Sequence, residues 1–269
     1  MNKGDVSRML RAAGLMHLTD VMRYRYYKFK NSKKNQQFRK EHPEVKLPPD
    51  YHIYESFQID YEEYYLKSRE SAEWVLGFLK KYKPLEKLTV LDWGCGPGRI
   101  IRHLPDFLDA ESRIFGTDYN EVSINWCKTN LPGIDFNLNG LEADLPYDND
   151  FFDFIYGISI FTHLSEKMHY EWIEELFRVM KPGGVLFLTM HGDAFIPKLS
   201  KAELDDYKSG RIVVRGNVKE GHRTFAAFHP EAFTKKLFSK FNVLEHVTQK
   251  PSGEKPQQDI WIIQKPIAS

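Results

Sequence analysis

VLDWGCGPGR, residues 90–99, is an apolar run that passes directly into three glycines at alternate positions, Gly94, Gly96 and Gly98. The apolar residues predict a β-strand over 88–93, and a helix is predicted to follow over 100–108. Glycine tolerates a positive φ and lets a ligand approach the bare backbone. This strand, loop and helix therefore predict a ligand site at the carboxyl edge of a parallel sheet.

Strand and helix patterns alternate along the rest of this region. Four strands and two helices are predicted over 113–117, 134–138, 152–158 and 184–190, and over 122–129 and 166–180. Such alternation is typical of an α/β fold, in which helices cover both faces of a doubly wound, Rossmann-like and mostly parallel sheet. Two more strands, 241–247 and 259–264, are predicted near the end of the sequence.

A small insertion, residues 192–228, interrupts this alternation after the fifth strand. Ser200 and Glu203 have the spacing of a capping box, which predicts a short helix that ends at Gly210. Residues 211–215 and 223–228 are expected to pair as strands. The insertion is therefore predicted to contain a short helix and a pair of strands.

Two acids accompany the glycine loop. Asp92 is expected at the mouth of the loop, and Asp118 ends the next strand. A dinucleotide loop usually reads G-x-G-x-x-G, whereas this chain has Arg99 where the third glycine would stand. Asp92 would repel a diphosphate and attract an ammonium group, and Asp118 could accept hydrogen bonds from both ribose hydroxyls. An adenosyl group with an amino-acid tail satisfies both acids.

With these residues the chain resembles the class I S-adenosylmethionine-dependent methyltransferases. The resemblance rests on four features: VLDWGCGPG at 90–98, Asp118, LPYDNDFFDFIYGIS at 145–159 and KPGGVLF at 181–187. The hairpin predicted over 241–264 also looks like the antiparallel final strand of that family. The resemblance implies a methyltransferase with S-adenosylmethionine as its cofactor and S-adenosylhomocysteine as its product.

The same resemblance assigns roles to individual residues. It implies that the methionyl part lies on Asp92 and on the loop residues Gly94, Cys95, Gly96 and Gly98, with Cys95 as a small filler. Asp118 would bind the ribose, with Tyr119 beside the adenine, Leu141 and Glu142 at its border, and Ser159 near the sulfonium. The family often has an acid for the adenine amino group where this chain has Leu141. Glu142 or a backbone carbonyl is the expected substitute.

A sulfonium methyl group is already activated, so the protein has to align the acceptor and exclude water. A hydroxyl acceptor also requires a general base. The candidate bases are three histidines that follow predicted strands or end the insertion: His163, His191 and His229. A lone histidine is more often structural, so their convergence in space is the test. No metal-binding constellation is evident in the sequence.

The acceptor class is predicted from what residues 157–161 lack. They read GISIF, without the Asn/Asp-Pro-Pro-aromatic motif of the family's amino-directed nucleic-acid enzymes. The segments 161–164 and 258–261 look similar to bacterial enzymes that methylate small molecules or saccharides, so a hydroxyl of such an acceptor is favoured. Two alternatives stay open: a nicotinamide-dependent oxidoreductase, and a non-catalytic module that contacts nucleic acid or a membrane through residues 1–40.

Composition sets the remaining expectations. The chain has 269 residues, of which 42% are hydrophobic and 28% charged, and these values predict a folded protein that is either one large domain or one domain with an appendage. Two cysteines exclude a disulfide framework. Because neither a secretory signal nor a long apolar run is present, a cytoplasmic protein is expected.

Charge is distributed unevenly along the chain. Residues 1–40 carry eleven Lys and Arg against two Asp, although the net charge of the whole chain is +1. Residues 5–30 have a basic, amphipathic helical pattern, and residues 31–50 are polar and hinge-like. We therefore predict a basic, tyrosine-rich extension or cap over 1–60 and a methyltransferase domain over 61–269. The extension either packs on the acidic body or meets an anion: a phosphate-bearing acceptor, nucleic acid or a membrane surface, where the protein would be peripheral.

Overall fold

The computed structural model describes residues 16–216, 218, 220–222, 224–249 and 256–267. The chain divides into two compact units, Met1–Glu70 and Ser71–Ser269. This division falls inside helix α5 (Tyr61–Leu79), later than the boundary predicted at residue 60. None of the helices within the described ranges is both long and apolar enough to cross a bilayer.

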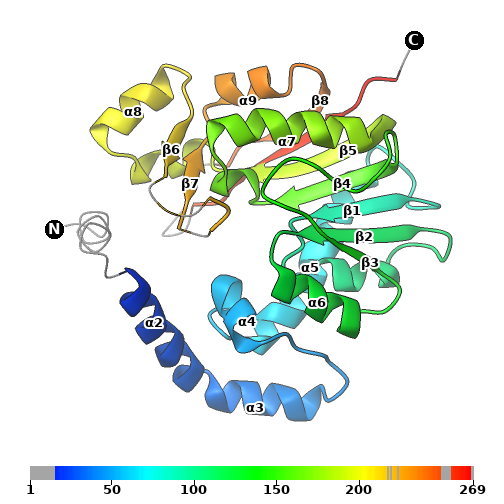
Figure 1. Ribbon diagram of the computed structural model, residues 1–269, viewed down its shortest axis with the longest axis vertical. Helices are drawn as coiled ribbons and strands as arrows, with labels where there is room; N and C mark the ends of the chain where they lie inside the picture. The colour runs from blue at the N-terminus through cyan, green and yellow to red at the C-terminus, as the bar shows by residue number, and fades with distance from the viewer. Residues whose placement is uncertain (1–15, 217, 219, 223, 250–255, 268–269) are drawn as a thin grey trace. The chain divides into compact units, whose positions relative to one another are not determined.

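The larger unit is built on a seven-stranded sheet in the order β3-β2-β1-β4-β5-β9-β8 (Figure 1). Its strands are β1 (Thr89–Trp93), β2 (Arg113–Asp118), β3 (Asp135–Leu138), β4 (Phe152–Ile158), β5 (Met180–Met190), β8 (Asn242–Val247) and β9 (Asp259–Gln264). β1 to β5 pair in parallel, whereas β9 runs antiparallel to β5 and β8. The predicted fold class, a doubly wound and mostly parallel sheet with an antiparallel final strand, is confirmed.

Each face of the sheet has its own buried apolar cluster. Leu91 and Trp93 of β1 pack in one cluster with α7 (Glu166–Val179) and α9 (Glu231–Leu237). Val90 packs in the other, with the second half of α5 and with α6 (Glu121–Asn130). Because neighbouring side chains of a strand point to opposite faces, β1 is buried on both sides and its carboxyl end is held firmly.

The helix predicted over residues 100–108 differs from the one in the structure. This segment forms the 3-10 helix η1 (Ile101–Asp106), which contains Pro105. Proline has no N–H to donate, so it interrupts the hydrogen bonding of an α-helix. The glycine loop is therefore not followed by a regular α-helix.

The insertion folds as a small layer of its own. It contains the 3-10 helix η3 (Asp193–Lys198), α8 (Lys201–Lys208) and the antiparallel strands β6 (Val213–Arg215) and β7 (Ala226–Phe228). The capping box is present: the Ser200 Oγ accepts from the Glu203 N–H, and the Glu203 carboxylate accepts from the Ser200 N–H. The short helix and the strand pair are therefore confirmed.

The smaller unit begins with α2 (Met16–Lys30), α3 (Ser32–Glu41) and α4 (Asp50–Phe57), as Figure 1 shows. The helix expected over 5–30 is confirmed from residue 16 onward, and residues 1–15 lie outside the described part. α3 lies in the stretch 31–50 that the sequence indicated only as polar and hinge-like, and α4 follows it. Their contacts with aromatic side chains explain the difference, because Phe38, Tyr54, Tyr61 and Tyr64 are buried in one cluster.

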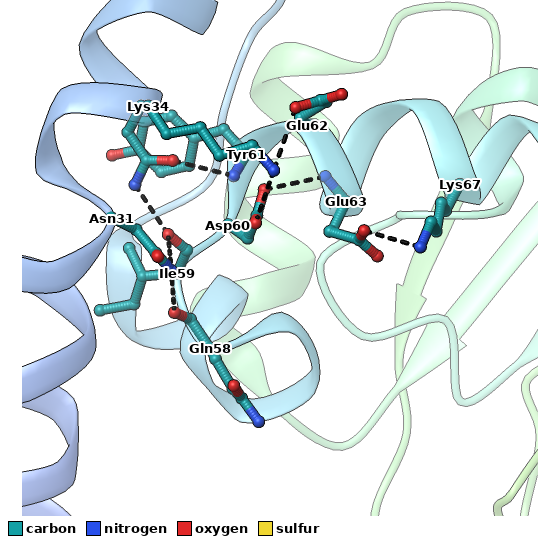
Figure 2. A network of polar contacts seen from close by, with 10 residues as sticks. Asn31, Lys34, Gln58, Ile59, Asp60, Tyr61, Glu62, Glu63 and Lys67 are labelled. Carbon is teal, nitrogen blue, oxygen red and sulfur yellow. Dashed lines mark hydrogen bonds and ion pairs between the residues drawn. The ribbon is translucent and has the colours of Figure 1, made fainter.

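A polar network turns the chain from α4 into α5 (Figure 2). Gln58 and Ile59 have φ values of 54° and 59°, which non-glycine residues rarely adopt. The Nδ2 of Asn31 donates to the Gln58 carbonyl at 3.0 Å, and the Nδ2 of Asn35 donates to the Ile59 carbonyl at 2.7 Å. Lys34 pairs with Asp60 at 2.9 Å. These bonds hold a strained turn that joins three helices.

Replacing Gln58 with glycine relieves part of this strain, because the exposed Gln58 ends α4 in the left-handed region. We expect Gln58→Gly to raise the free energy of unfolding by about 0.5–1 kcal/mol, measured by urea denaturation followed by circular dichroism. Gln58→Ala is the control, since it keeps the Cβ and therefore the strain. Equal stability of the Gly and Ala variants would contradict the expectation.

Candidate active site

A cavity lies where β1 to β4 end at the carboxyl edge of the sheet. Its lining includes Trp93, Gly94, Asp118, Asn139, Ile160 and His163. The strand order reverses between β1 and β4, which makes this edge the topological switch point of the sheet. The ligand site predicted from the glycine loop therefore coincides with a cavity.

The glycine loop is folded against β2 by its own amide groups. The N–H groups of Gly94 and Cys95 donate to the Thr117 carbonyl at 2.8 and 2.9 Å. The Gly96 N–H donates to the Asp118 Oδ2 at 2.8 Å, and the Gly98 N–H donates to the Cys95 carbonyl at 3.0 Å. Position 97 is a proline without an N–H. Every amide donor between residues 94 and 98 is thus used within the protein.

This bonding bears on the nature of the ligand. Loops that bind phosphate do so with free backbone N–H groups aimed at the anion. Here those groups are occupied, and the loop instead offers glycine Cα atoms: a Cβ on Gly96 would meet nothing within 4 Å. At Gly94, where φ is +77°, a Cβ would lie 2.2 Å from Ile160 Cδ1. The loop therefore disfavours a diphosphate and with it the dinucleotide alternative.

Asp118 and Asn139 supply acceptors at the cavity. Each Asp118 oxygen accepts one backbone N–H, from Gly96 and from Asn120, both at 2.8 Å. Burial raises the pKa of Asp118, although these two hydrogen bonds oppose the rise. Asn139, which the sequence analysis missed, donates through Nδ2 to the Gly140 carbonyl, and its buried Oδ1 has no partner among the described residues. A polar residue directly after β3 was the available signal.

Asp92, which precedes the glycine loop, is buried and is not among the residues that line the cavity. Its side chain is 4% exposed and accepts a hydrogen bond from the Tyr156 hydroxyl at 2.7 Å. Burial raises the pKa of Asp92 to about 7. Trp93, the next residue, lines the cavity instead. The reason is strand alternation, which turns neighbouring side chains to opposite faces.

Some of the residues predicted to border the adenine line the cavity. Tyr119 and Leu141 line the cavity, together with Gly221 of the insertion. The Tyr119 hydroxyl donates to the Gly221 carbonyl at 3.0 Å, and the Trp172 Nε1 donates to the Leu141 carbonyl at 3.1 Å. Glu142 is exposed and is not part of the cavity lining. The insertion thus reaches the cavity, which its sequence did not indicate.

Ser159, at the end of β4, and Cys95, within the glycine loop, are not among the residues that line the cavity. Ser159 has a φ of 65°, and its Oγ accepts from the Gln258 Nε2 at 2.7 Å. Its N–H donates to the Thr189 Oγ1 at 2.8 Å. Cys95 is buried, and burial raises the pKa of its thiol, which fits a filler rather than a nucleophile. A strained residue held by side chains at a strand end is typical of functional sites.

Of the three predicted histidines, His163 lines the cavity and His191 lies near it in a similar setting. The Nδ1 of His163 donates to the Phe225 carbonyl at 2.8 Å, and the Nδ1 of His191 donates to the Ala227 carbonyl at 3.0 Å. Burial lowers the pKa of His163, and it lowers the pKa of His191 to about 3. Both rings are therefore neutral near pH 7, with the proton on Nδ1 and a lone pair on Nε2.

His229 corrects the third prediction. It is 3% exposed, and its Nε2 lies 2.9 Å from the Nε2 of His169, a buried residue of α7. The Nδ1 of His169 donates to the Ser165 carbonyl, so His169 accepts at Nε2 and His229 donates. Burial also lowers the pKa of His229. This pair joins α7 to the end of the insertion and is sealed away from the cavity.

The raised pKa of Asp92 predicts a pH-dependent cost to folding. An acid that has a pKa of about 7 when folded and about 4 when unfolded reduces stability as the pH rises through that range. Asp92→Asn keeps an acceptor for Tyr156 and removes the charge. We expect it to raise the free energy of unfolding by about 2–4 kcal/mol near pH 8, with a smaller gain near pH 5, measured by urea denaturation.

Asp153→Asn is the matched control with the opposite sign. Burial favours a raised pKa for Asp153, but hydrogen bonds from Lys181 and from the Thr89 N–H lower it. Its substitution should therefore destabilise the protein near pH 8. A destabilised Asp92→Asn variant at the same pH would show that Asp92 is not a strained acid.

Comparisons with known proteins agree with this geometry. A family profile described as "Methyltransferase domain" matches residues 90–184. A probable S-adenosylmethionine-dependent methyltransferase of Mycolicibacterium smegmatis is 30% identical over 37% of this chain and 37% of its own length. The demethylmenaquinone methyltransferase of Lactococcus lactis is 26% identical over 49% of this chain and 54% of its own length. The matches thus span less than two thirds of these relatives.

Solved structures share the fold over a longer stretch. A methyltransferase from Methanosarcina mazei superimposes with a TM-score of 0.55 and 23% identity over 71% of this chain and 98% of its own. The magnesium protoporphyrin IX methyltransferase of Synechocystis, solved with bound SAH, gives 0.54 and 16% over 90% and 99%. The sheet order, the glycine loop and the profile match agree: residues 90–184 match a methyltransferase domain, and the larger unit has the fold of the class I S-adenosylmethionine-dependent methyltransferases.

Proposed function

We propose that this chain transfers the methyl group of S-adenosylmethionine to a hydroxyl group of a small molecule or saccharide. The observation that carries the proposal is the neutral imidazole of His163 at the cavity that Gly94 and Asp118 also line. The named relatives do not select an acceptor, because they include enzymes for a sterol, for demethylmenaquinone and for tRNA. The acceptor is therefore argued from the residues of this chain.

The residues at the cavity fit the cofactor. When bound, S-adenosylmethionine supplies a methyl group that its sulfonium makes electrophilic. Asp118 can accept the ribose hydroxyls, since each carboxylate oxygen has a lone pair beyond the one that accepts an N–H. The unpartnered Oδ1 of Asn139 suits the adenine amino group, and Tyr119 and Leu141 offer apolar surface to the ring. The open space at Gly96 leaves room for the methionyl chain.

His163 has the protonation and orientation that a general base requires. The Phe225 carbonyl can only accept a hydrogen bond, so it fixes the proton of the neutral ring on Nδ1. Within the described residues, the Nε2 atom of His163 has no hydrogen-bond partner, and it is not fully buried. The lone pair on Nε2 can therefore receive the proton of the acceptor hydroxyl as its oxygen gains the methyl group.

His191 supports a polyhydroxyl acceptor. Its ring is oriented by the Ala227 carbonyl in the same way as His163 is by Phe225, two residues earlier. Alternate carbonyls of an extended strand point to the same side and lie about 7 Å apart. With a pKa of about 3, His191 stays neutral and is a weak base, so it accepts a hydrogen bond from a second hydroxyl instead of removing a proton. It is a positioning residue in this proposal.

The proposal is tested by calorimetry and by methyl transfer to a chemical panel. The protein should bind S-adenosylmethionine and S-adenosylhomocysteine but not NAD⁺. Labelled methyl groups should be transferred to saccharides or phenols, and not to amines or tRNA, in matched assays. Binding of the cofactor with transfer only to amines or tRNA would overturn the acceptor class, and binding of NAD⁺ alone would overturn the whole proposal.

Removal of the base should affect turnover and leave cofactor binding intact. We expect His163→Gln to reduce kcat about 100-fold or more, with the affinity for S-adenosylhomocysteine unchanged. The acidic decline of kcat/KM, which reflects protonation of His163 below its lowered pKa, should disappear from the pH profile of this variant. His191→Gln should mainly raise KM. His42→Gln, in the smaller unit, is the control, and an unchanged kcat in His163→Gln would exclude a base at this position.

The glycine loop offers a separate prediction with a matched control. Gly94 and Gly133 both have positive φ values, +77° and +81°, so an alanine strains the backbone at either position. Only at Gly94 does the new Cβ also collide, with Ile160 at the cavity, whereas nothing lies within 4 Å at Gly133. We expect Gly94→Ala to weaken S-adenosylhomocysteine binding at least tenfold in calorimetry while Gly133→Ala binds normally. Similar affinities would show that the loop does not contact the cofactor.

A further inference from the structure

We propose that α2 is a docking surface for an anionic lipid bilayer. The inference concerns the smaller unit alone and does not depend on the proposed methyl transfer. It rests on the way apolar and basic side chains are arranged around this one helix.

An exposed apolar stripe runs along α2. Leu18, Met22, Tyr26 and Phe29 are 56%, 64%, 57% and 84% exposed. Their spacings of four, four and three residues place them within an arc of about 80° on a helix with 3.6 residues per turn. Large apolar side chains that gather on one exposed face usually mark a surface that meets a partner.

The opposite face of α2 is the one that holds the helix in its unit. Tyr24 and Tyr27 pack against the buried aromatic cluster of that unit. Asp20, the only acid in α2, accepts a hydrogen bond from the Tyr54 hydroxyl at 2.7 Å. Lys28 pairs with Asp50 at 3.0 Å. The apolar stripe is therefore not needed to attach α2 to the smaller unit.

Exposed cations accompany the stripe. Arg23 and Lys30 lie on one side of it, and Arg25 lies at its other edge. The Nζ of Lys30 lies 5.7 Å from the centre of the Tyr26 ring, so its aliphatic stem follows the apolar surface while the charge stays at the rim. This is the arrangement of a helix that lies in a membrane interface, with apolar residues in the acyl region and cations among the headgroups.

The combination of side chains distinguishes a bilayer from a nucleic acid. A nucleic acid backbone would be recognised by the cations, but it offers no apolar environment to Leu18, Met22 or Phe29. A bilayer with anionic headgroups satisfies both sets at once, because it supplies negative charge at its surface and hydrocarbon directly beneath. The charge and the apolar stripe therefore agree on one partner.

The full chain should sediment with phosphatidylcholine vesicles that contain about a third phosphatidylserine, and not with phosphatidylcholine alone. Because exposed charges are screened within about 10 Å at moderate ionic strength, added salt should weaken this binding. Failure to bind the anionic vesicles would overturn the proposal. Equal binding to both kinds of vesicle would overturn the part assigned to charge.

Paired variants separate the apolar contribution from general surface effects. Met22→Ser with Phe29→Ser should reduce vesicle binding at least tenfold. The matched control changes two exposed apolar residues of the larger unit, Val122→Ser in α6 with Ile267→Ser, which are 58% and 72% exposed. The control should bind like the unchanged protein. Equal loss in both variants would overturn the assignment to α2, and retained S-adenosylhomocysteine binding and circular dichroism verify folding.

A charge variant completes the test. Changing Arg23, Arg25 and Lys30 to Gln should weaken binding about fivefold per charge removed. Its control removes three exposed lysines of the larger unit, at 128, 208 and 236, and should bind normally. A gel shift with single-stranded RNA or duplex DNA, lost in the charge variant and retained in Met22→Ser with Phe29→Ser, would assign the surface to nucleic acid and overturn the proposal.

Discussion

The tie between the glycine loop and β2 is the constraint on which the site depends. Three N–H groups of the loop cross to the Thr117 carbonyl and the Asp118 carboxylate. These bonds use the donors that a phosphate would need. They also fix the orientation of Asp118 at the cavity. The loop therefore disfavours a diphosphate because of how it is bonded, with no contribution required from Asp92.

The parts of the fold that follow from local rules were predictable from the sequence. Apolar runs gave the positions of the strands, and the spacing of Ser200 and Glu203 gave the start of α8. The burial of Asp92 away from the cavity was not predicted, although the sequence carried the information needed. Since Leu91 and Trp93 share one face of β1, Asp92 belongs to the other. Because neighbouring side chains of a strand point to opposite faces, the sequence would have predicted Trp93, and not Asp92, at the cavity.

Other features had no local signature. His163 is oriented by a carbonyl that lies 62 residues later in the chain, and no pattern around either residue indicates this pairing. α3 is polar along most of its length and is held by Asn35 and Phe38, which are buried only because α4 and α5 fold over them. Ile59 adopts a positive φ that its side chain disfavours, and bonds from distant residues maintain it. Tertiary contacts decide each of these cases, so sequence rules alone cannot reach them.

The four histidines of the site region show why burial alone does not define a base. Burial lowers the pKa of all four, yet the acceptor bonded to each ring decides which nitrogen keeps its lone pair and where that lone pair lies. In His169 and His229 the two rings bond to each other and make a structural link. In His163 and His191 the Nδ1–H groups donate to the carbonyl of Phe225, just before β7, and to the carbonyl of Ala227 within it. The insertion therefore supplies the orientation of the two imidazoles, while the ends of β1 to β4 supply Trp93, Asp118 and Asn139 to the same part of the molecule.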